Sequence, residues 1–162
     1  MGTEILMTQF GYNEYALRTN TADMNHHQSC LQPSPAGNCI NWIVGHILSS
    51  RNKVLQLLDE KPVWSSDDAG WYATGSKPIV DPESALPFGR MFKDLATSQS
   101  RIMEGLRKIG PEGLSKDVPS EMAGDKKVTI GNYLAGLAFH EAYHAGQTGI
   151  IRRLIGKDGA IG

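Results

Sequence analysis

Four long stretches of this chain repeat apolar residues at the spacing of one α-helical face, and this periodicity constrains the fold most. The first stretch runs from about residue 6 to 28, and the others cover about 38–59, 81–110 and 129–156. The apolar residues recur at steps of about three and four, as the core-facing side of a helix requires. No segment gives a convincing strand. We therefore expect an all-α four-helix bundle that forms a single domain over residues 1–162.

Residues that favour helix ends lie between these stretches. Asn38 and Thr129 are good N-caps, and Asp81 is followed by a proline, which suits the first turn of a helix. Gly110 and the proline after it stop the third predicted helix, and Gly156 closes the fourth. The last three predicted helices are thus expected to begin at a local signal, and the last two are expected to end at one.

A long connection joins the second and third predicted helices. Residues 60–80 are rich in Pro, Gly and Asp, and they are too irregular for a helix and longer than a simple turn needs. The segment carries Trp64, Trp71 and Tyr72, whose rings suit a cover over core as well as the wall of a pocket. We expect this connection to lie over an opening in the bundle.

The composition fits an ordinary globular domain. The 162 residues are 40% hydrophobic and 20% charged, which is enough apolar material for a core. With 16 basic and 17 acidic residues and a net charge of −1, we expect no nucleic-acid partner. No leader segment opens the chain and no apolar run approaches the roughly 20 residues of a membrane span, so we expect a cytoplasmic protein without a membrane partner. Cys30 and Cys39 fit neither a zinc knuckle nor a redox pair and are expected to be reduced thiols.

The run from His140 to His144 reads HEAYH and contains the metalloprotease pattern HExxH. Two histidines four residues apart lie on one side of a helix and can bind one metal ion. A zinc protease needs a third ligand, usually a His or Glu after the motif, and the only acidic side chain or histidine that follows is Asp158. The sequence therefore favours another kind of metalloprotein, with its third ligand upstream.

His46 is the best upstream candidate because of its helical phase. It lies between apolar residues of the second predicted helix, with Trp42 one turn before it on the same side. His140 and His144 continue the apolar stripe of the fourth helix, so three imidazoles can converge inside the bundle. Three protein ligands leave an open coordination position for water or substrate. A single His on an apolar face is more often a hydrogen-bonded core residue than a metal ligand. The prediction of a metal site therefore depends on all three positions together.

Other polar and aromatic residues near these positions are candidates for the site. Glu141 could act as a general base or could lie at the boundary of the bundle. Gln147, one turn after His144, could hydrogen-bond a ligand or fix an imidazole tautomer. We also expect Trp42, Asn13 and Tyr143 to lie in the pocket or beside the ligands, although each could equally serve packing.

Two segments of the chain resemble those of a known family. Residues 41–46 read NWIVGH and residues 140–147 read HEAYHAGQ. Together they resemble the DinB and YfiT-like superfamily over essentially the whole chain. The resemblance implies a four-helix bundle with a long connection between helices 2 and 3. It also implies one divalent metal ion, zinc or nickel, held by His46, His140 and His144, and it suggests a homodimer.

The same resemblance sets the functional expectations. Characterised members include thiol-dependent S-transferases, some of which use bacillithiol, and a mycothiol-dependent isomerase, while others are described as metal-dependent hydrolases. For this chain we expect a metal-dependent enzyme that acts on a small-molecule substrate. The first expectation is a thiol S-transferase that uses a low-molecular-weight thiol as cosubstrate. The alternatives are a hydrolase in which Glu141 is the base, and a metal-binding or interaction bundle without catalysis.

Overall fold

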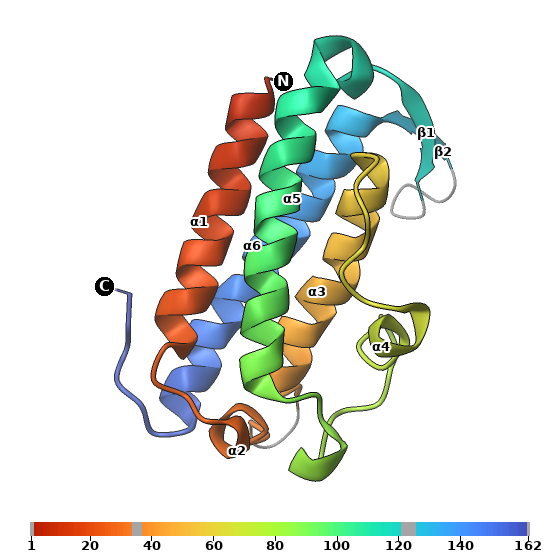
Figure 1. Ribbon diagram of the computed structural model, residues 1–162. Coiled ribbons are helices and arrows are strands. Elements are labelled where there is room, and N and C mark those ends of the chain that lie inside the picture. Colours follow the sequence, from red (N-terminus) through yellow and green to blue (C-terminus); the bar gives the residue numbers. More distant parts are fainter. Residues whose placement is uncertain (1, 34–36, 121–125, 162) are drawn as a thin grey trace.

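Four long helices pack side by side in the structure, a computed structural model that describes residues 2–33, 37–120 and 126–161 (Figure 1). This arrangement confirms the predicted all-α bundle. The long helices are α1 (Thr3–Thr21), α3 (Ile40–Leu57), α5 (Phe88–Leu114) and α6 (Ile130–Leu154).

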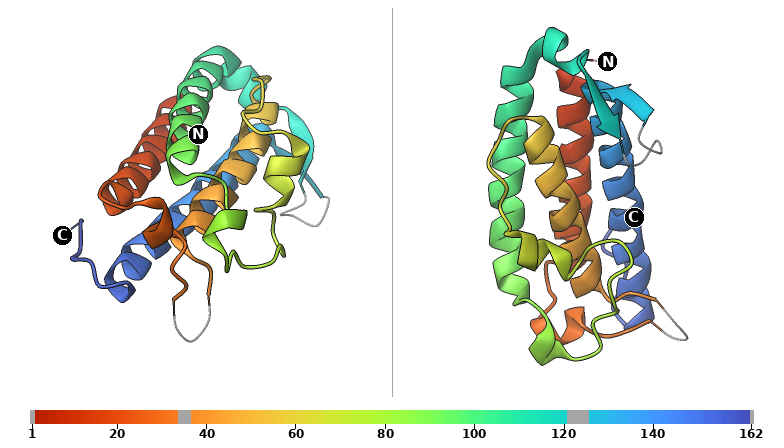
Figure 2. Two further views of the ribbon diagram at one scale, coloured as in Figure 1. Left: turned by 60° about the horizontal axis from the view of Figure 1, so that its bottom comes forward. Right: turned by 90° about the vertical axis from the view of Figure 1, so that its right-hand side faces the viewer.

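The direction of the helices explains the long connection. Helices α3 and α5 run the same way and are neighbours, while α1 and α6 run the other way (Figure 1). A chain that leaves α3 must therefore return over the length of the bundle before α5 can begin. This return segment contains α4 (Ser66–Gly70) and a 3-10 turn (Pro82–Ser84), and Figure 2 shows it passing across the outer side of α3. It passes the half of α3 that carries His46.

The first predicted helix extends too far. Helix α1 ends at Thr21, and a separate short helix, α2 (His26–Ser29), follows it. Asn25 starts α2 with a capping box: its side chain accepts from the backbone N–H of Gln28, and the Gln28 side chain accepts from the backbone N–H of Asn25. This reciprocal cap favours a new helix start over continuation of α1, which the apolar period alone does not reveal.

The other predicted helix ends are confirmed in part. Thr129 caps α6, since its side chain accepts from the Asn132 N–H, and Gly110 interrupts α5 with a φ of 62°. Asp81 caps only the 3-10 turn, and α5 begins at Phe88, because the residue before Pro87 is disfavoured in a helix. Helix α3 begins after Cys39 rather than after the predicted cap Asn38.

The expectation that the chain has no strand is wrong. A small antiparallel pair, β1 (Asp117–Ser120) and β2 (Lys126–Thr129), joins α5 to α6, with Asp117 opposite Thr129. Both strands are short and place one valine each against the core, Val118 and Val128, which is too little apolar alternation to mark a strand in the sequence.

The core consists of two apolar clusters with a polar layer between them. Leu17, Ile43 and Leu95 belong to the cluster near α2, and Phe10 and Ile102 belong to the cluster near the strands. At the middle of the bundle, each long helix has a buried polar residue at a position where its inward face is otherwise apolar. These polar-layer residues are Asn13 on α1, Arg51 on α3, Ser98 on α5 and Glu141 on α6. Within the described residues, no helix has both the length and the apolar character needed to cross a membrane.

Candidate metal centre

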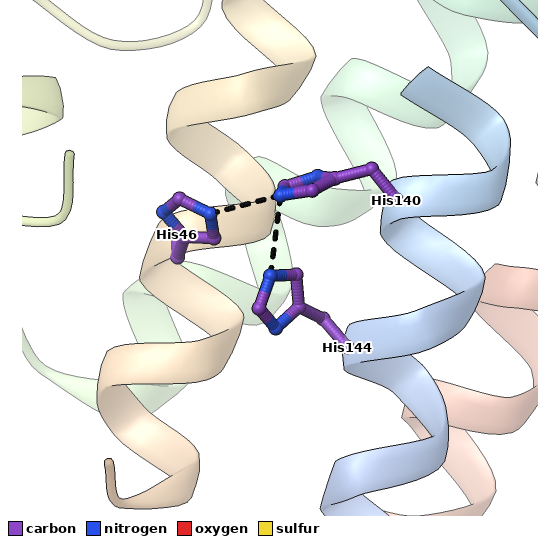
Figure 3. Close-up of side chains that lie close together, drawn as sticks. All are labelled: His46, His140 and His144. Carbon is purple, nitrogen blue, oxygen red and sulfur yellow. Dashed lines mark hydrogen bonds between the residues drawn. The ribbon is translucent and has the colours of Figure 1, made fainter. Parts of the chain in front are cut away.

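Three histidine side chains converge between α3 and α6, as the sequence predicts (Figure 3). His46 comes from the second turn of α3, and His140 and His144 come from successive turns of α6. Nε2 of His140 lies 3.1 Å from Nε2 of His46 and 3.2 Å from Nε2 of His144. The three candidate ligand atoms lie within 4.8 Å of one another, so this group could hold a metal ion.

Hydrogen bonds on the far side of two rings fix which nitrogen faces the centre. Nδ1 of His46 lies 2.8 Å from the carbonyl oxygen of Tyr72, and Nδ1 of His144 lies 2.8 Å from Oε1 of Gln147. These oxygens can only accept, so each Nδ1 carries the hydrogen and each Nε2 presents a lone pair. Nε2 of His140 has at most one hydrogen and can satisfy only one of its two neighbours. At least one close nitrogen–nitrogen contact therefore lacks a proton.

A cation among the three nitrogens fits this donor set. With zinc–nitrogen bonds of 2.0–2.1 Å, two ligands of a tetrahedral site lie about 3.3 Å apart, close to the two short separations in the structure. Nδ1 of His140 is buried without a hydrogen-bond partner among the described residues. Two of the separations thus fit metal ligands, and the three Nε2 atoms lack the full set of hydrogen bonds that buried polar atoms normally make.

Burial keeps the three imidazoles neutral. It lowers the pKa of His140 to about 4, together with the neighbouring His144 and His46. Burial also lowers the pKa of His46 and of His144, and it outweighs the hydrogen bonds to Tyr72 and Gln147, which act in the opposite direction. A neutral imidazole is the form that binds a metal ion, so the rings are in the binding form at neutral pH.

The long connection orients His46 through the backbone of Tyr72. The Tyr72 ring is 1% exposed, and its hydroxyl donates to Oδ1 of Asn41 and accepts from the N–H of Leu86. The ring lies against Gly45, where an added Cβ would come within 2.5 Å of Cγ of Tyr72. Glycine at this position therefore allows the close approach that brings the Tyr72 carbonyl to His46.

We expect Gly45→Ala to destabilise the protein by about 1 to 3 kcal/mol, because the added methyl group overpacks the Tyr72 ring. Displacing the Tyr72 carbonyl from His46 should also weaken metal binding by about 10- to 100-fold. Urea unfolding and competition with a coloured chelator measure the two effects. Gly11→Ala is the control, since nothing lies within 4 Å of its Cβ position and it should leave stability unchanged or higher. Equal behaviour of the two variants would contradict the role of Tyr72.

Glu141 lies in the polar layer and is bound by Arg51. Its Oε1 and Oε2 accept from Nη2 and Nε of Arg51 at 2.7 and 2.9 Å, and both side chains are buried. Burial alone would lower the pKa of Arg51, but the charge and hydrogen bonds of Glu141 raise it, so the guanidinium stays charged. With both oxygens in a two-point ion pair, Glu141 occupies a structural position rather than that of a free base.

A pocket of about 460 Å³ opens beside His144. Trp42, Tyr143 and Gln147, which the sequence analysis names as candidates for the pocket or for positions beside the ligands, line it. Asn13 does not line this pocket: its amide donates to the carbonyl oxygen of Ala138 at 2.9 Å and joins α1 to α6. Its polar character on an inward helix face reflects this bond within the polar layer.

Two contributors to the site escape the sequence analysis. The Tyr72 group that contacts His46 is a backbone carbonyl, and backbone groups carry no sequence signal. Arg51 is fully buried, and a buried arginine looks like a surface residue until its partner is known. The one sequence feature that indicates burial of Arg51 is its position, one helical turn after the apolar residues on either side of His46.

Taken together, the fold and the site define a helical bundle with an inward three-histidine group that could hold a metal ion. The chain belongs to the DinB superfamily, whose family model matches residues 10–148. It is also similar to a solved structure described as a conserved protein from Enterococcus faecalis, with a TM-score of 0.73 and 19% sequence identity. That match covers 96% of this chain and 98% of the other, and it shows a shared fold. None of the curated proteins compared with the chain matches it significantly.

Proposed function

We propose that the protein is a metal-dependent enzyme that transfers a small thiol to an electrophilic substrate. The observation that carries the proposal is the convergence of three Nε2 atoms that have too few hydrogens to bond with one another. One of the three histidines, His144, also lines a pocket. Three ligands leave a coordination position open. A divalent ion held there, with zinc or nickel as the first candidates, would act as a Lewis acid that lowers the pKa of a thiol.

The position of Glu141 favours thiol transfer over hydrolysis. In zinc proteases the Glu of HExxH serves as the base for water, but here the carboxylate is bound by Arg51. A thiol has a pKa near 8.5 and is easily deprotonated without a protein base. Its sulfur would bond to the substrate carbon, the leaving group would depart with its electron pair, and the thiol proton would pass to solvent.

The chain's own residues would position these reactants. The Tyr72 carbonyl and Gln147 hold the His46 and His144 rings with Nε2 toward the centre. The Trp42 ring stacks on His46 with centroids 4.8 Å apart and is fixed by a bond from its Nε1 to Oγ of Ser76. This face of the pocket is therefore rigid next to the reacting atoms, which favours a fixed approach of substrate.

The assay uses protein loaded with zinc or nickel, 1-chloro-2,4-dinitrobenzene as electrophile, and 2-mercaptoethanol, cysteine or glutathione as thiol. We expect thioether formation above the uncatalysed rate, lost with chelator and in His46→Ala. His27→Ala is the control, since His27 is exposed on α2 and should react like wild type. Metal-dependent hydrolysis of 4-nitrophenyl acetate without thiol transfer would instead support the hydrolase. Absence of both reactions in metal-loaded protein would overturn the enzymatic proposal.

A further inference from the structure

The pocket beside His144 has apolar and aromatic walls. Its volume of about 460 Å³ lies in the range of small-molecule sites. Seven of its described lining residues are apolar or aromatic: Pro33, Trp42, Ile43, Tyr143, Ile150, Ile151 and Leu154.

The described lining residues include no Lys, Arg, Asp or Glu. Among the described residues, the polar side chains that line the pocket are Asn38, Gln147 and His144. These groups can hydrogen-bond to a neutral oxygen or nitrogen, but they do not supply the opposite charge that a buried ion requires.

We infer that this pocket selects uncharged, largely apolar small molecules and disfavours anions of the same size that do not coordinate the metal ion. A ligand of this class replaces the water against the indole of Trp42 and the aliphatic side chains. An anionic ligand that does not coordinate the metal ion loses its hydration without gaining a cationic partner from the described pocket walls. The inference rests on the proposed function, in that it names the class of electrophilic substrate for the same site.

Two ligands of nearly equal shape test the selectivity on metal-loaded protein. Methyl 2-naphthyl sulfone is neutral, and naphthalene-2-sulfonate is its anionic counterpart, with a sulfonate group that coordinates metals weakly. Isothermal titration calorimetry measures both dissociation constants without thiol or turnover. We expect the sulfone to bind at least 10-fold more tightly than the sulfonate.

Ile150→Lys places a positive charge at the pocket wall. The Ile150 side chain is 63% exposed, so the fold should tolerate lysine there. We expect this variant to bind the sulfonate at least 5-fold more tightly than wild type does, and to bind the sulfone no better. Ile5→Lys is the control, since Ile5 is 53% exposed on α1 and does not line this pocket, and its affinities should match wild type.

Equal or tighter binding of the sulfonate by wild type, or binding of neither ligand at millimolar concentration, would overturn the inference. An unchanged sulfonate affinity in Ile150→Lys would show that the ligands bind elsewhere and would overturn it as well. These outcomes are separate from those of the enzymatic assay. Selective binding without thiol transfer would support the pocket and contradict the proposed reaction, whereas thiol transfer without selective binding would do the reverse.

Discussion

Glu141→Gln is expected to lower the free energy of unfolding by about 3 to 5 kcal/mol, because it leaves Arg51 charged, buried and without its counter-ion. For a chain of this length the loss corresponds to a fall in Tm of roughly 6 to 20 °C. Arg51 is fully buried, and its remaining bonds to Ser98 and the Leu95 carbonyl are to neutral groups that cannot balance its charge. Chemical and thermal unfolding followed by circular dichroism measure the change.

The same variant separates a structural role of Glu141 from a catalytic one. A catalytic base can be replaced by Gln with loss of activity and little loss of stability. In the polar layer the loss of stability should dominate, and thiol transfer at a temperature where the variant is folded should persist. Glu112→Gln, at an exposed position on α5, is the control and should change stability by less than about 0.5 kcal/mol. A stable but inactive Glu141→Gln would contradict this assignment.

Replacing both partners tests how the ion pair contributes. The double variant Arg51→Met/Glu141→Leu removes both charges and should regain most of the stability that either single change loses, since apolar pairs often replace buried ion pairs without cost. The pair joins α3 to α6, the two helices that carry the histidines. If the polar layer sets the register of these helices, metal affinity should fall in the double variant even where stability is regained. Unchanged metal affinity would show that apolar packing alone positions the ligands.

The sequence predicts the long helices and the inward direction of the three histidines because both follow from the same helical period of apolar residues. Residues three and four apart share a helix face, so the apolar stripes that mark α3 and α6 also place His46, His140 and His144 inward. The period predicts only the inward direction of the rings, and their meeting also requires that the two helices pack with His46 at the level of His140. Because His140 and His144 are four residues apart, both rings lie on the same side of α6.

Other features depend on contacts that a periodic pattern does not contain. The break after Thr21 depends on the reciprocal cap between Asn25 and Gln28, two polar residues inside a stretch whose apolar period continues. The Glu141 carboxylate is directed by Arg51, ninety residues away in sequence. The metal identity, the thiol and the predicted homodimer stay predictions, because imidazole spacing and a single chain do not determine them.

Removal of the metal should lower stability in proportion to its occupancy. An ion that binds only the folded state at 100 times its Kd adds about 2.7 kcal/mol, which corresponds to roughly 5 to 10 °C in Tm for a chain of this length. We expect about one divalent ion per chain after reconstitution, as three inward histidines imply. Elemental analysis gives the stoichiometry, and thermal unfolding with and without chelator gives the shift.

His140→Ala isolates the contribution of the site from that of the core. His140 is the ring whose Nε2 contacts both of the others, so its removal should abolish stoichiometric metal and with it the chelator-dependent shift in Tm. The metal-free variant should unfold within about 4 °C of metal-free wild type, since His140 is only half-buried and its Nδ1 has no hydrogen-bond partner among the described residues. His27→Ala should keep both the metal and the shift. Wild-type protein that binds no divalent ion after reconstitution would contradict the metal centre, and a His140→Ala variant that still binds one would show that other groups hold it.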